Sequence, residues 1–227
     1  MQFNYLFEIK HVIIRILEET MKILTQLTKN GKVPVKQHES DYAFDMYTTK
    51  DVLVMQGELS AVKVPLGIKT EFDSEHYGMI IAPRSSFSKL PLSLPNSFGI
   101  VEGSYRGEWL LTLRNTMSMA GTSNKVLTLG KDGKVKEVPL SSVSPRAISD
   151  AKRRFENDNK VLNMVTPKRV ENSLFSSVVP AATVYIEAGT RLVQTYAVKK
   201  EPIEFVKASI LNESERGSGS FGSTGIK

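Results

Sequence analysis

One short stretch, residues 96–108, combines the features of a base-binding hairpin with a single acid at its centre. Glycines separate short apolar runs, which predicts two strands that meet at the Gly-Ser turn of residues 103–104. Glu102 lies at the tip, close to the aromatic Tyr105. A hairpin tip offers free N–H and C=O groups with which the edge of a flat base can pair. On these residues alone, an ordinary surface hairpin is an open alternative.

Composition restricts the chemistry. The chain has 227 residues, enough for one domain and an appendage, and its hydrophobic content of 41% is ordinary for a soluble globular protein. It contains no cysteine, which excludes disulfides and thiolate chemistry, and its scattered histidines do not indicate a zinc site. The net charge of +6 suits an anionic ligand such as a nucleoside triphosphate or nucleic acid, although a mildly basic protein without such a ligand would show the same charge.

Five segments, in order along the chain, resemble the five motifs of the trimeric dUTPase family. The hairpin resembles the third, the uracil-binding motif, typically Gly-Val-Ile-Asp-x-x-Tyr-Arg-Gly-Glu. The others are Asp-Tyr-Ala-Phe-Asp-Met-Tyr at residues 41–47, Pro-Arg-Ser-Ser at 83–86, Gly-Thr-Arg-Leu-Val-Gln at 189–194 and a glycine-rich tail at 216–225. Each match is short, but all five in the family order form a specific pattern. The resemblance covers residues from about 21 to 227, interrupted by an insert.

This resemblance implies an all-β, jelly-roll-like fold that forms a homotrimer, with each active site built from several chains. It also implies that the protein is a dUTP diphosphatase, which hydrolyses dUTP to dUMP and pyrophosphate by attack of water at the α-phosphate with Mg²⁺ as cofactor. A Mg²⁺ that bridges the phosphates mainly through water ligands needs no protein cage. No protein residue is therefore expected to be a metal ligand.

Three residues would carry catalysis. By resemblance, Glu102 takes the place of the family's aspartate as the general base. Arg84 of the second motif would contact phosphate oxygens, and Asp45 of the first motif would help to organise the charged site.

The other expected site residues would bind the nucleotide. Main-chain groups of the hairpin would pair with the uracil edge and exclude a 5-methyl group, while Tyr105 would lie where a ribose 2′-hydroxyl would go. The glycine-rich tail would close over the site as a lid, with N–H groups that cradle phosphates and an aromatic ring that stacks on the base. The predicted binding residues are Ser85, Ser86, Asn96, Gly99, Val101, Tyr105, Gln194, Arg216, Phe221, Gly222, Ser223 and Thr224. A packed strand aromatic and a flexible terminus are the alternative interpretations of Tyr105 and of the tail.

The sequence departs from the family pattern within the first three motifs. Glu102 in place of aspartate moves the carboxylate outward by about one carbon, and a misplacement of ~1 Å can cost ~10²-fold in rate. Ser86 replaces a glycine in the second motif, and Tyr42-Ala43 replaces Ala-Gly in the first. Both changes could tighten the backbone near the phosphates.

Many short strands are predicted to position these residues. Apolar or alternating runs broken by turn residues indicate an all-β sandwich or barrel. The runs lie at residues 21–27, 52–55, 61–64, 77–81, 109–113 and 183–198, and residues 201–210 are interpreted as a final strand. The segment from 211 to 227 is rich in glycine, serine and charge and would be disordered alone.

Residues from about 117 to 180 form an insert, because the family's link between its third and fourth motifs is much shorter. A short helix is predicted at residues 147–159, with Pro145 in its first turn and Ser144 or Ser149 near its start, and a hairpin turn at residues 131–134. The insert is either a solvated surface insertion or a docking surface for a protein, nucleic acid or the triphosphate. Inserts here occur in some phage members of the family and can contact partner proteins.

The first 20 residues show an amphipathic helical pattern that is too charged to span a membrane and lacks a signal peptide's apolar core. Such a helix could lie on a membrane surface or cap the domain. We interpret it as an extension without a role in catalysis and expect a cytoplasmic protein with no membrane partner. The expected division is 1–20 for the extension, 21–210 for the β domain with its insert, and 211–227 for a flexible lid.

Three other functions are open. A dCTP deaminase would share the fold, but its glutamate would align near Thr112, where this chain has no carboxylate. A triphosphatase for another deoxynucleotide is consistent with the altered acid. A nucleotide-sensing regulator would keep the pocket and act through its insert.

Overall fold

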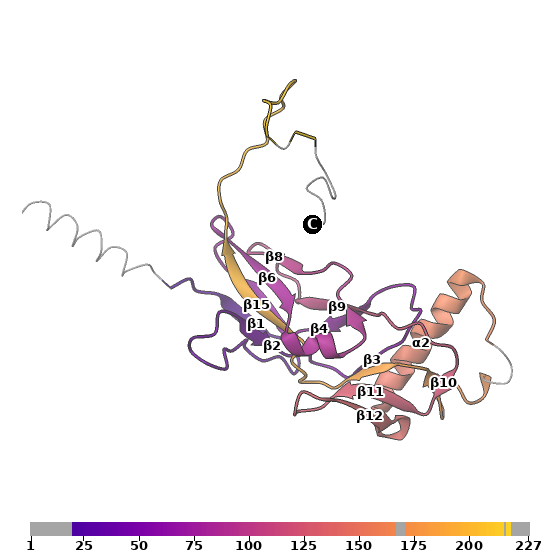
Figure 1. The fold of residues 1–227 in the computed structure, drawn as a ribbon. Helices are drawn as coiled ribbons and strands as arrows, with labels where there is room; N and C mark the ends of the chain where they lie inside the picture. The colour runs from indigo at the N-terminus through magenta and orange to yellow at the C-terminus, as the bar shows by residue number, and fades with distance from the viewer. Residues whose placement is uncertain (1–19, 167–170, 216, 219–227) are drawn as a thin grey trace, which may run out of the picture.

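A computed structural model describes residues 20–166, 171–215 and 217–218, and shows short strands in several small sheets with a long helix at one end (Figure 1). The strands are β1 (Leu24–Leu27), β2 (Phe44–Met46), β3 (Val52–Val54), β4 (Val62–Pro65), β5 (Ile68–Glu71), β6 (Tyr77–Pro83), β7 (Leu92–Ser93), β8 (Gly99–Glu102), β9 (Leu110–Asn115), β10 (Thr122–Ser123), β11 (Lys125–Leu129), β12 (Val135–Pro139), β13 (Val179–Pro180), β14 (Val184–Ile186) and β15 (Val193–Lys199). The helices are α2 (Pro145–Leu162) and the 3-10 turns η1 (Ser85–Lys89) and η2 (Leu140–Ser142).

Two four-stranded sheets carry most of the architecture. One has the order β2-β15-β6-β8 and is antiparallel throughout, and the other has the order β12-β11-β14-β3 with a parallel β11–β14 pair. A three-stranded sheet, β4-β9-β7, and the pairs β1-β5 and β10-β13 complete the set. The sheets do not close into a barrel. The predicted mostly-β class is confirmed.

Both hydrophobic cores meet at β3. Successive side chains of a strand point to opposite faces, so Val52 and Val54 enter the main core while Leu53, followed by Met55, enters a second one. The main core also holds Trp109, Leu111 and Leu113 from the segment of β9. The second core lies against the insert and contains Val126, Leu140, Val143, Ala147, Ala151, Phe175, Val179 and Tyr185. A strand buried on both sides explains the uninterrupted apolar run at residues 52–55.

The predicted helix of the insert is confirmed and is longer than expected, from Pro145 to Leu162. Pro145 begins it because a first-turn residue needs no N–H partner. Ala147 and Ala151, four residues apart, form the small buried face that contacts β3. The helix ends where Asn163 adopts a left-handed conformation with φ 53°, a geometry that asparagine tolerates.

The rest of the insert extends a sheet of the main body. The predicted turn at residues 131–134 joins β11 to β12, with Gly133 at φ +70°, and β11 then pairs with β14. The insert therefore contributes strands and core residues, and a loop lying only on the surface would not do so.

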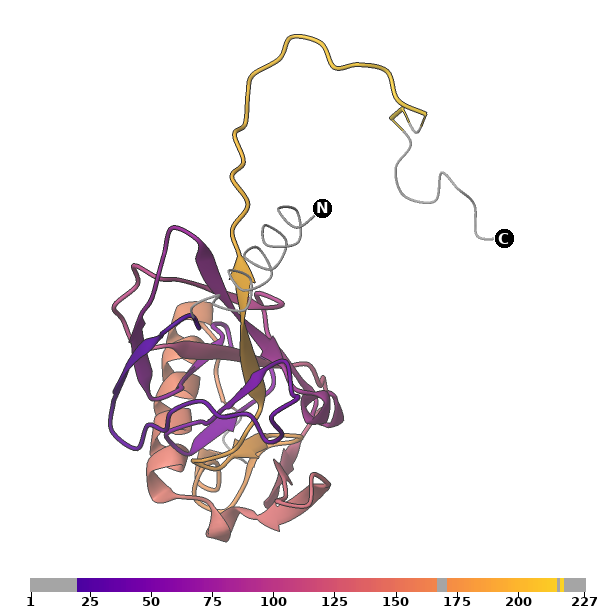
Figure 2. The same cartoon turned by 90° about the vertical axis from the view of Figure 1, so that its left-hand side faces the viewer.

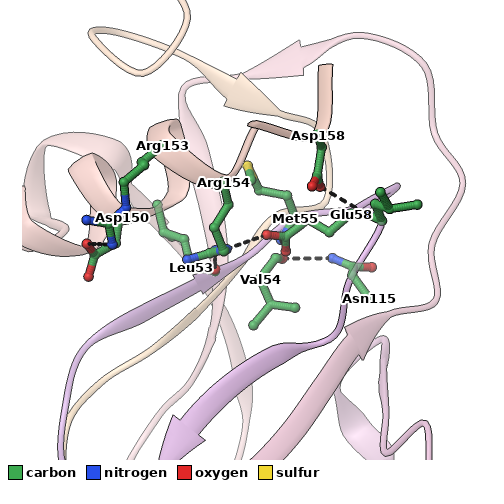
Figure 3. A network of polar contacts seen from close by, with 10 residues as sticks. Leu53, Val54, Met55, Glu58, Asn115, Asp150, Arg153, Arg154 and Asp158 are labelled. Carbon is green, nitrogen blue, oxygen red and sulfur yellow. Dashed lines mark hydrogen bonds and ion pairs between the residues drawn. The ribbon is translucent and has the colours of Figure 1, made fainter. Parts of the chain in front are cut away.

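A buried ion pair holds α2 to the main body (Figure 3). Arg154 donates from Nε to Glu58 Oε1 at 2.6 Å and from Nη2 to the Leu53 carbonyl at 2.5 Å. Glu58 also accepts a hydrogen bond from the Met55 N–H at 2.9 Å, and Asp158 of α2 accepts one from the Leu59 N–H at 2.9 Å. Burial raises the pKa of Glu58 above its ordinary value, although Arg154 partly offsets this.

One predicted strand is absent. Residues 201–210 alternate in a strand-like way, but they form no ladder and are exposed. A strand needs a neighbour for its N–H and C=O groups, and no other described segment of the chain lies beside them. They leave the end of β15 and run away from the body as an extended arm (Figures 1 and 2).

The expected hairpin at residues 96–108 is also wrong in its second half. β8 forms as predicted, but it pairs with β6, and after Glu102 the chain turns without returning along β8. Burial of Trp109 explains this, because its N–H and C=O bond to Ile68 and Leu66 in another part of the fold.

Two predictions fall outside the described residues: the helix of residues 1–20, apart from its last residue, and the glycine-rich end of the tail. Across the described ranges, no helix has both the length and the apolar character needed to cross a bilayer.

The Glu58–Arg154 pair should hold the insert in place. Arg154→Leu should lower the free energy of unfolding by about 3 kcal/mol near pH 7, because it leaves a buried carboxylate without its cation. Urea unfolding followed by circular dichroism would measure this.

The loss should depend on pH with a defined sign. A raised pKa in the folded state means that folded Glu58 binds its proton more tightly, so its contribution to stability is complete below its unfolded pKa and falls as the pH rises through the folded value. Arg154 lowers the pKa of Glu58, so Arg154→Leu should raise the folded-state pKa further and destabilise the protein mainly where the carboxyl is ionised. The deficit of Arg154→Leu should therefore shrink as the pH is lowered toward 4.5 and the carboxyl becomes protonated. A deficit that stays constant with pH would contradict this assignment.

Candidate functional site

A cavity of about 300 Å³ lies along β8 and is called the β8 cavity. Its lining includes every predicted hairpin residue: Asn96, Gly99, Val101, Glu102 and Tyr105. Ile81 of β6, together with Trp109 and Leu110 at the start of β9, also lines it. The structure thus brings the predicted hairpin residues together around one cavity.

β8 is the edge strand of its sheet, because in the order β2-β15-β6-β8 only β6 lies beside it. An edge strand has N–H and C=O groups on its outer side that no neighbouring strand uses. Thr112 donates its hydroxyl hydrogen to Asn96 Oδ1 at 3.1 Å and so orients that amide at the cavity. Such a rim of main-chain and amide groups can pair with the polar edge of a flat heterocycle.

The turn that follows Glu102 is built around Tyr105. The Tyr105 N–H donates to the Glu102 carbonyl at 3.0 Å, and its ring folds over Gly107 so closely that any side chain there would collide with it. Arg106 donates to the Gly103 carbonyl at 2.6 Å and closes the turn. The Tyr-Arg-Gly sequence therefore has a steric reason: the glycine makes room for the ring.

The Glu102 carboxylate is about half exposed and makes one ion pair. Lys200 Nζ lies 2.9 Å from Glu102 Oε2 and 2.8 Å from the Ser74 carbonyl. Sequence reasoning missed Lys200, which stands 98 residues away along the chain and belongs to no recognised motif.

A second hollow, the arginine cavity, has a volume of about 630 Å³. Asp45 is at its base, with Oδ1 2.7 Å from Arg84 Nε and Oδ2 2.9 Å from Arg191 Nη1. The Asp45 side chain is only 8% exposed, while both arginines are partly open to the cavity. Two guanidinium groups oriented by one buried carboxylate have the geometry and charge to bind oxygens of an anion such as phosphate.

Strand pairing places the rest of this cluster. Gln194 on β15 stands opposite Asp45 on β2, and its amide donates to the Pro83 carbonyl at 3.3 Å. Ser85 and Ser86 follow Arg84 in η1; Ser85 is exposed, whereas the Ser86 hydroxyl is buried without a hydrogen-bond partner among the described residues.

The role of Arg191 was also not predicted, although a signal was present. Arg191 is the arginine of the Gly-Thr-Arg-Leu-Val-Gln segment, of which only Gln194 was predicted from the sequence to be a binding residue. Tyr42, one of the departures from the first motif, packs against Tyr196 at the rim, with ring centroids 5.3 Å apart.

A single chain does not bring all the predicted catalytic residues together. Glu102 pairs with Gly78 near the start of β6, and Arg84 follows the end of that strand. Six residues of extended chain separate these positions, which is roughly 20 Å. The predicted tail residues Arg216, Phe221, Gly222, Ser223 and Thr224 lie outside the described part.

The donor set does not form a protein cage for a metal. Within the described ranges, no group of three or more histidine or acidic residues is arranged to hold an ion. Both oxygens of Asp45 are engaged by arginines, and Glu102 stands as a single acid. These residues fit a Mg²⁺ that would enter on the phosphates of a nucleotide and keep mostly water ligands.

Sequence comparison finds relatives among curated enzymes, while no protein-family model matches. Deoxyuridine 5′-triphosphate nucleotidohydrolase of Mycobacterium leprae is 34% identical over 99 residues, which cover 42% of this chain and 61% of the relative. The enzyme of Mycobacterium marinum is 31% identical over 86 residues, covering 37% and 53%. The chain thus spans between half and two thirds of the length of these relatives.

Structure comparison covers nearly the whole chain. The dUTPase of Staphylococcus bacteriophage 80alpha, solved with dUpNHpp, has a TM-score of 0.66 and 18% sequence identity over 91% of this chain and 100% of that one. That phage protein is described as controlling transfer of virulence genes by a G protein-like mechanism. A phage phi11 relative, at a TM-score of 0.59 and 15% identity, covers 85% of this chain and contains a structural Mg(II) ion. At such identities the likeness establishes the jelly-roll fold that was predicted, here in the form seen in the phage proteins, and the sequence relatives to which the chain is similar are dUTPases.

Proposed function

We propose that the protein is a dUTP diphosphatase that releases dUMP and pyrophosphate. The observation that carries this proposal is the β8 cavity, in which an edge strand with free main-chain groups ends at a carboxylate. Sequence similarity supports it, because the curated relatives are named for this reaction.

Recognition of uracil would come from the rim of the β8 cavity. Donors and acceptors of the Gly99–Glu102 strand and the Asn96 amide match a base edge that both donates and accepts. A mispaired cytosine edge would leave buried polar groups unsatisfied, which discriminates more strongly than a clash with a methyl group. Tyr105 would pack against the deoxyribose.

Glu102 is the proposed general base. Its carboxylate is open to solvent on one side, so it can accept a proton from a water molecule that attacks the α-phosphorus. Asp45 would act indirectly, because both of its oxygens are occupied in orienting Arg84 and Arg191.

Phosphate binding is assigned to the arginine cavity. Arg84 and Arg191 would neutralise phosphoryl oxygens, with the Ser85 hydroxyl and the Gln194 amide as further donors. When bound, Mg²⁺ would draw charge from the phosphate oxygens.

We propose a homotrimer, as the family resemblance implies, and the separation of Glu102 and Arg84 along β6 supports a site shared between subunits. If one chain supplies the β8 cavity and another supplies the arginines, each site needs at least two subunits. The exposed arm supports such exchange between subunits, because it carries Ile203, Phe205, Val206, Ile210 and Leu211, each at least 76% exposed. The tail beyond the arm would then reach a neighbour's site as the proposed lid, with residues 1–20 a separate extension.

A second candidate is a nucleotide-sensing regulator that acts through the insert. Its support is the attachment of α2 to the main body through Arg154, together with exposed apolar side chains at the end of α2, Val161 and Leu162, and just after it, Met164 and Val165. A protein or nucleic-acid partner bound there would be released or retained according to dUTP occupancy.

The primary test is release of pyrophosphate from dUTP, dCTP, dTTP and UTP with Mg²⁺. We expect dUTP to exceed the others by at least about 100-fold in kcat/KM, because each competitor lacks the matching base edge or adds a group. Equal use of dCTP or dTTP would favour a different deoxynucleotide triphosphatase.

Glu102→Gln keeps the shape of the side chain and removes the base. Turnover of dUTP should fall by at least about 100-fold, while binding of a non-hydrolysable dUTP analogue, measured by calorimetry, should change little. Full activity in this variant would remove Glu102 from its role.

The lid can be tested by ending the chain at Asn212. Turnover should drop by about 100-fold, because the site would stay open to bulk water and the phosphates would lose the donors of the tail. Removal of only Ile226 and Lys227 is the control. Unchanged kinetics in the longer truncation would rule out a lid.

Asp45→Asn should disorganise the arginine cavity. We expect a loss of about 3 kcal/mol in the free energy of unfolding, because two partly buried guanidinium groups would lose their counter-charge. A fall of at least about 10-fold in kcat/KM should accompany it. Asp150→Asn, which breaks a 2.8 Å contact with Arg153 on the distant helix, should leave kcat/KM unchanged. Normal activity of Asp45→Asn would contradict the assignment.

A further inference from the structure

The contact between Glu102 and Lys200 joins two strands that are not neighbours. β6 lies between β8 and β15, and Glu102 and Val198 both stand opposite Gly78. The Lys200 N–H continues the ladder by donating to the His76 carbonyl at 2.7 Å. Side chains two residues apart share a face, so Lys200, Gly78 and Glu102 lie on one side of the sheet.

Side-chain length decides whether this contact can form. β8 and β15 are separated by two strand spacings, roughly 10 Å, and Gly78 places no side chain between them. Glutamate and lysine are long enough to meet across this gap, at 2.9 Å. An aspartate at position 102 would be shorter by one carbon and would leave the gap open.

The Lys200 ammonium group is fixed by contacts within the protein itself. Its Nζ also donates to the Ser74 carbonyl at 2.8 Å. The loop that contains Ser74 is braced by Asp73, which accepts from the N–H groups of Glu75 and His76 and contacts the His76 ring at 2.7 Å. A braced loop presents a cation at one defined place beside the carboxylate.

The same loop supports the turn that carries Glu102. A side chain at Gly103 would lie 2.6 Å from the Phe72 carbonyl oxygen and 2.8 Å from Ser74 Cα, so the two segments are in direct contact. Lys200 and Glu102 are therefore anchored on one compact unit.

We propose that Lys200 is a positioning residue that holds the longer Glu102 side chain in its reactive place. This inference rests on the proposed hydrolysis of dUTP and deepens it. It also gives a physical reason why a glutamate can serve here, since the cation restrains the extra rotatable bond. Lys200 immediately precedes the arm, so the proposed general base is tied to the point where the arm leaves the body.

The test is a double-mutant cycle between positions 102 and 200. Steady-state kcat and KM for dUTP are measured in the wild-type protein, Lys200→Met, Glu102→Asp and the combined variant. Lys200→Met should lower kcat about 5- to 30-fold with KM within about twofold, because the base is misplaced while binding remains. Lys200→Arg should regain most of the loss.

In the Glu102→Asp background the same Lys200→Met change should alter kcat by less than about twofold, since the shorter acid does not reach the cation. Lys199→Met, at the next residue on the opposite face, is the matched control and should leave kcat unchanged. Equal losses in both backgrounds, a loss confined to KM, or a rise in kcat would overturn the inference.

A second measurement needs no turnover. Acylation of Lys200 by a small amine-reactive ester, followed by mass spectrometry, should be about threefold faster in Glu102→Gln than in the wild-type protein. Equal labelling would overturn the inference. If the wild-type protein hydrolyses dUTP but positions 102 and 200 show no coupling, this inference alone is overturned. If the wild-type protein does not hydrolyse dUTP, the proposed function is overturned as well.

Discussion

Pairing of β6 with a strand on each side determines where the chemistry of this protein can take place. β15 pairs with β6 over seven residues and places Gln194 toward one end of it and Lys200 just beyond the other. β8 pairs with residues 78–81 of β6 and places Glu102 opposite Gly78. A slip of one residue would turn Val101 out of the core and Glu102 into it. The register is therefore enforced by burial, and the polar groups of the site take their positions from it.

The same pairing divides the site. Because β6 is extended, the acid near its start and the arginine after its end are separated by the length of the strand. Binding a triphosphate in contact with both would require a second chain. The proposed homotrimer, whose subunits would share each site, would account both for the exposed apolar arm and for the separation of the two cavities.

Local pattern predicted much of this structure. The apolar runs at 52–55 and 77–81 and the proline-initiated helix were found because strand and helix periodicity are properties of neighbouring residues. The prediction of a hairpin was wrong in its second half, because β8 pairs with β6, some 20 residues earlier in the chain. Burial of Trp109, which directs the following segment elsewhere, cannot be deduced from the neighbouring residues. The prediction of a strand at 201–210 was wrong because such a pattern needs a neighbouring strand, and none of the residues that the structure describes provides one.

For the candidate site too, the sequence predicts which residues take part but not the long-range contacts that hold them. The motif residues Asp45, Arg84 and Gln194 do gather around one cavity, and the hairpin residues around another. How they are held was not predictable, because the Asp45–Arg191 and Glu102–Lys200 contacts join residues 146 and 98 positions apart. Such contacts follow from strand order, which a motif does not contain.

A crystal structure of the protein with a non-hydrolysable dUTP analogue would test the central claim most directly. The account predicts the uracil in the β8 cavity, paired with the outer edge of that strand, and the phosphates on Arg84 and Arg191 of a second subunit. A nucleobase bound elsewhere, with the outer edge of β8 facing solvent, would contradict it.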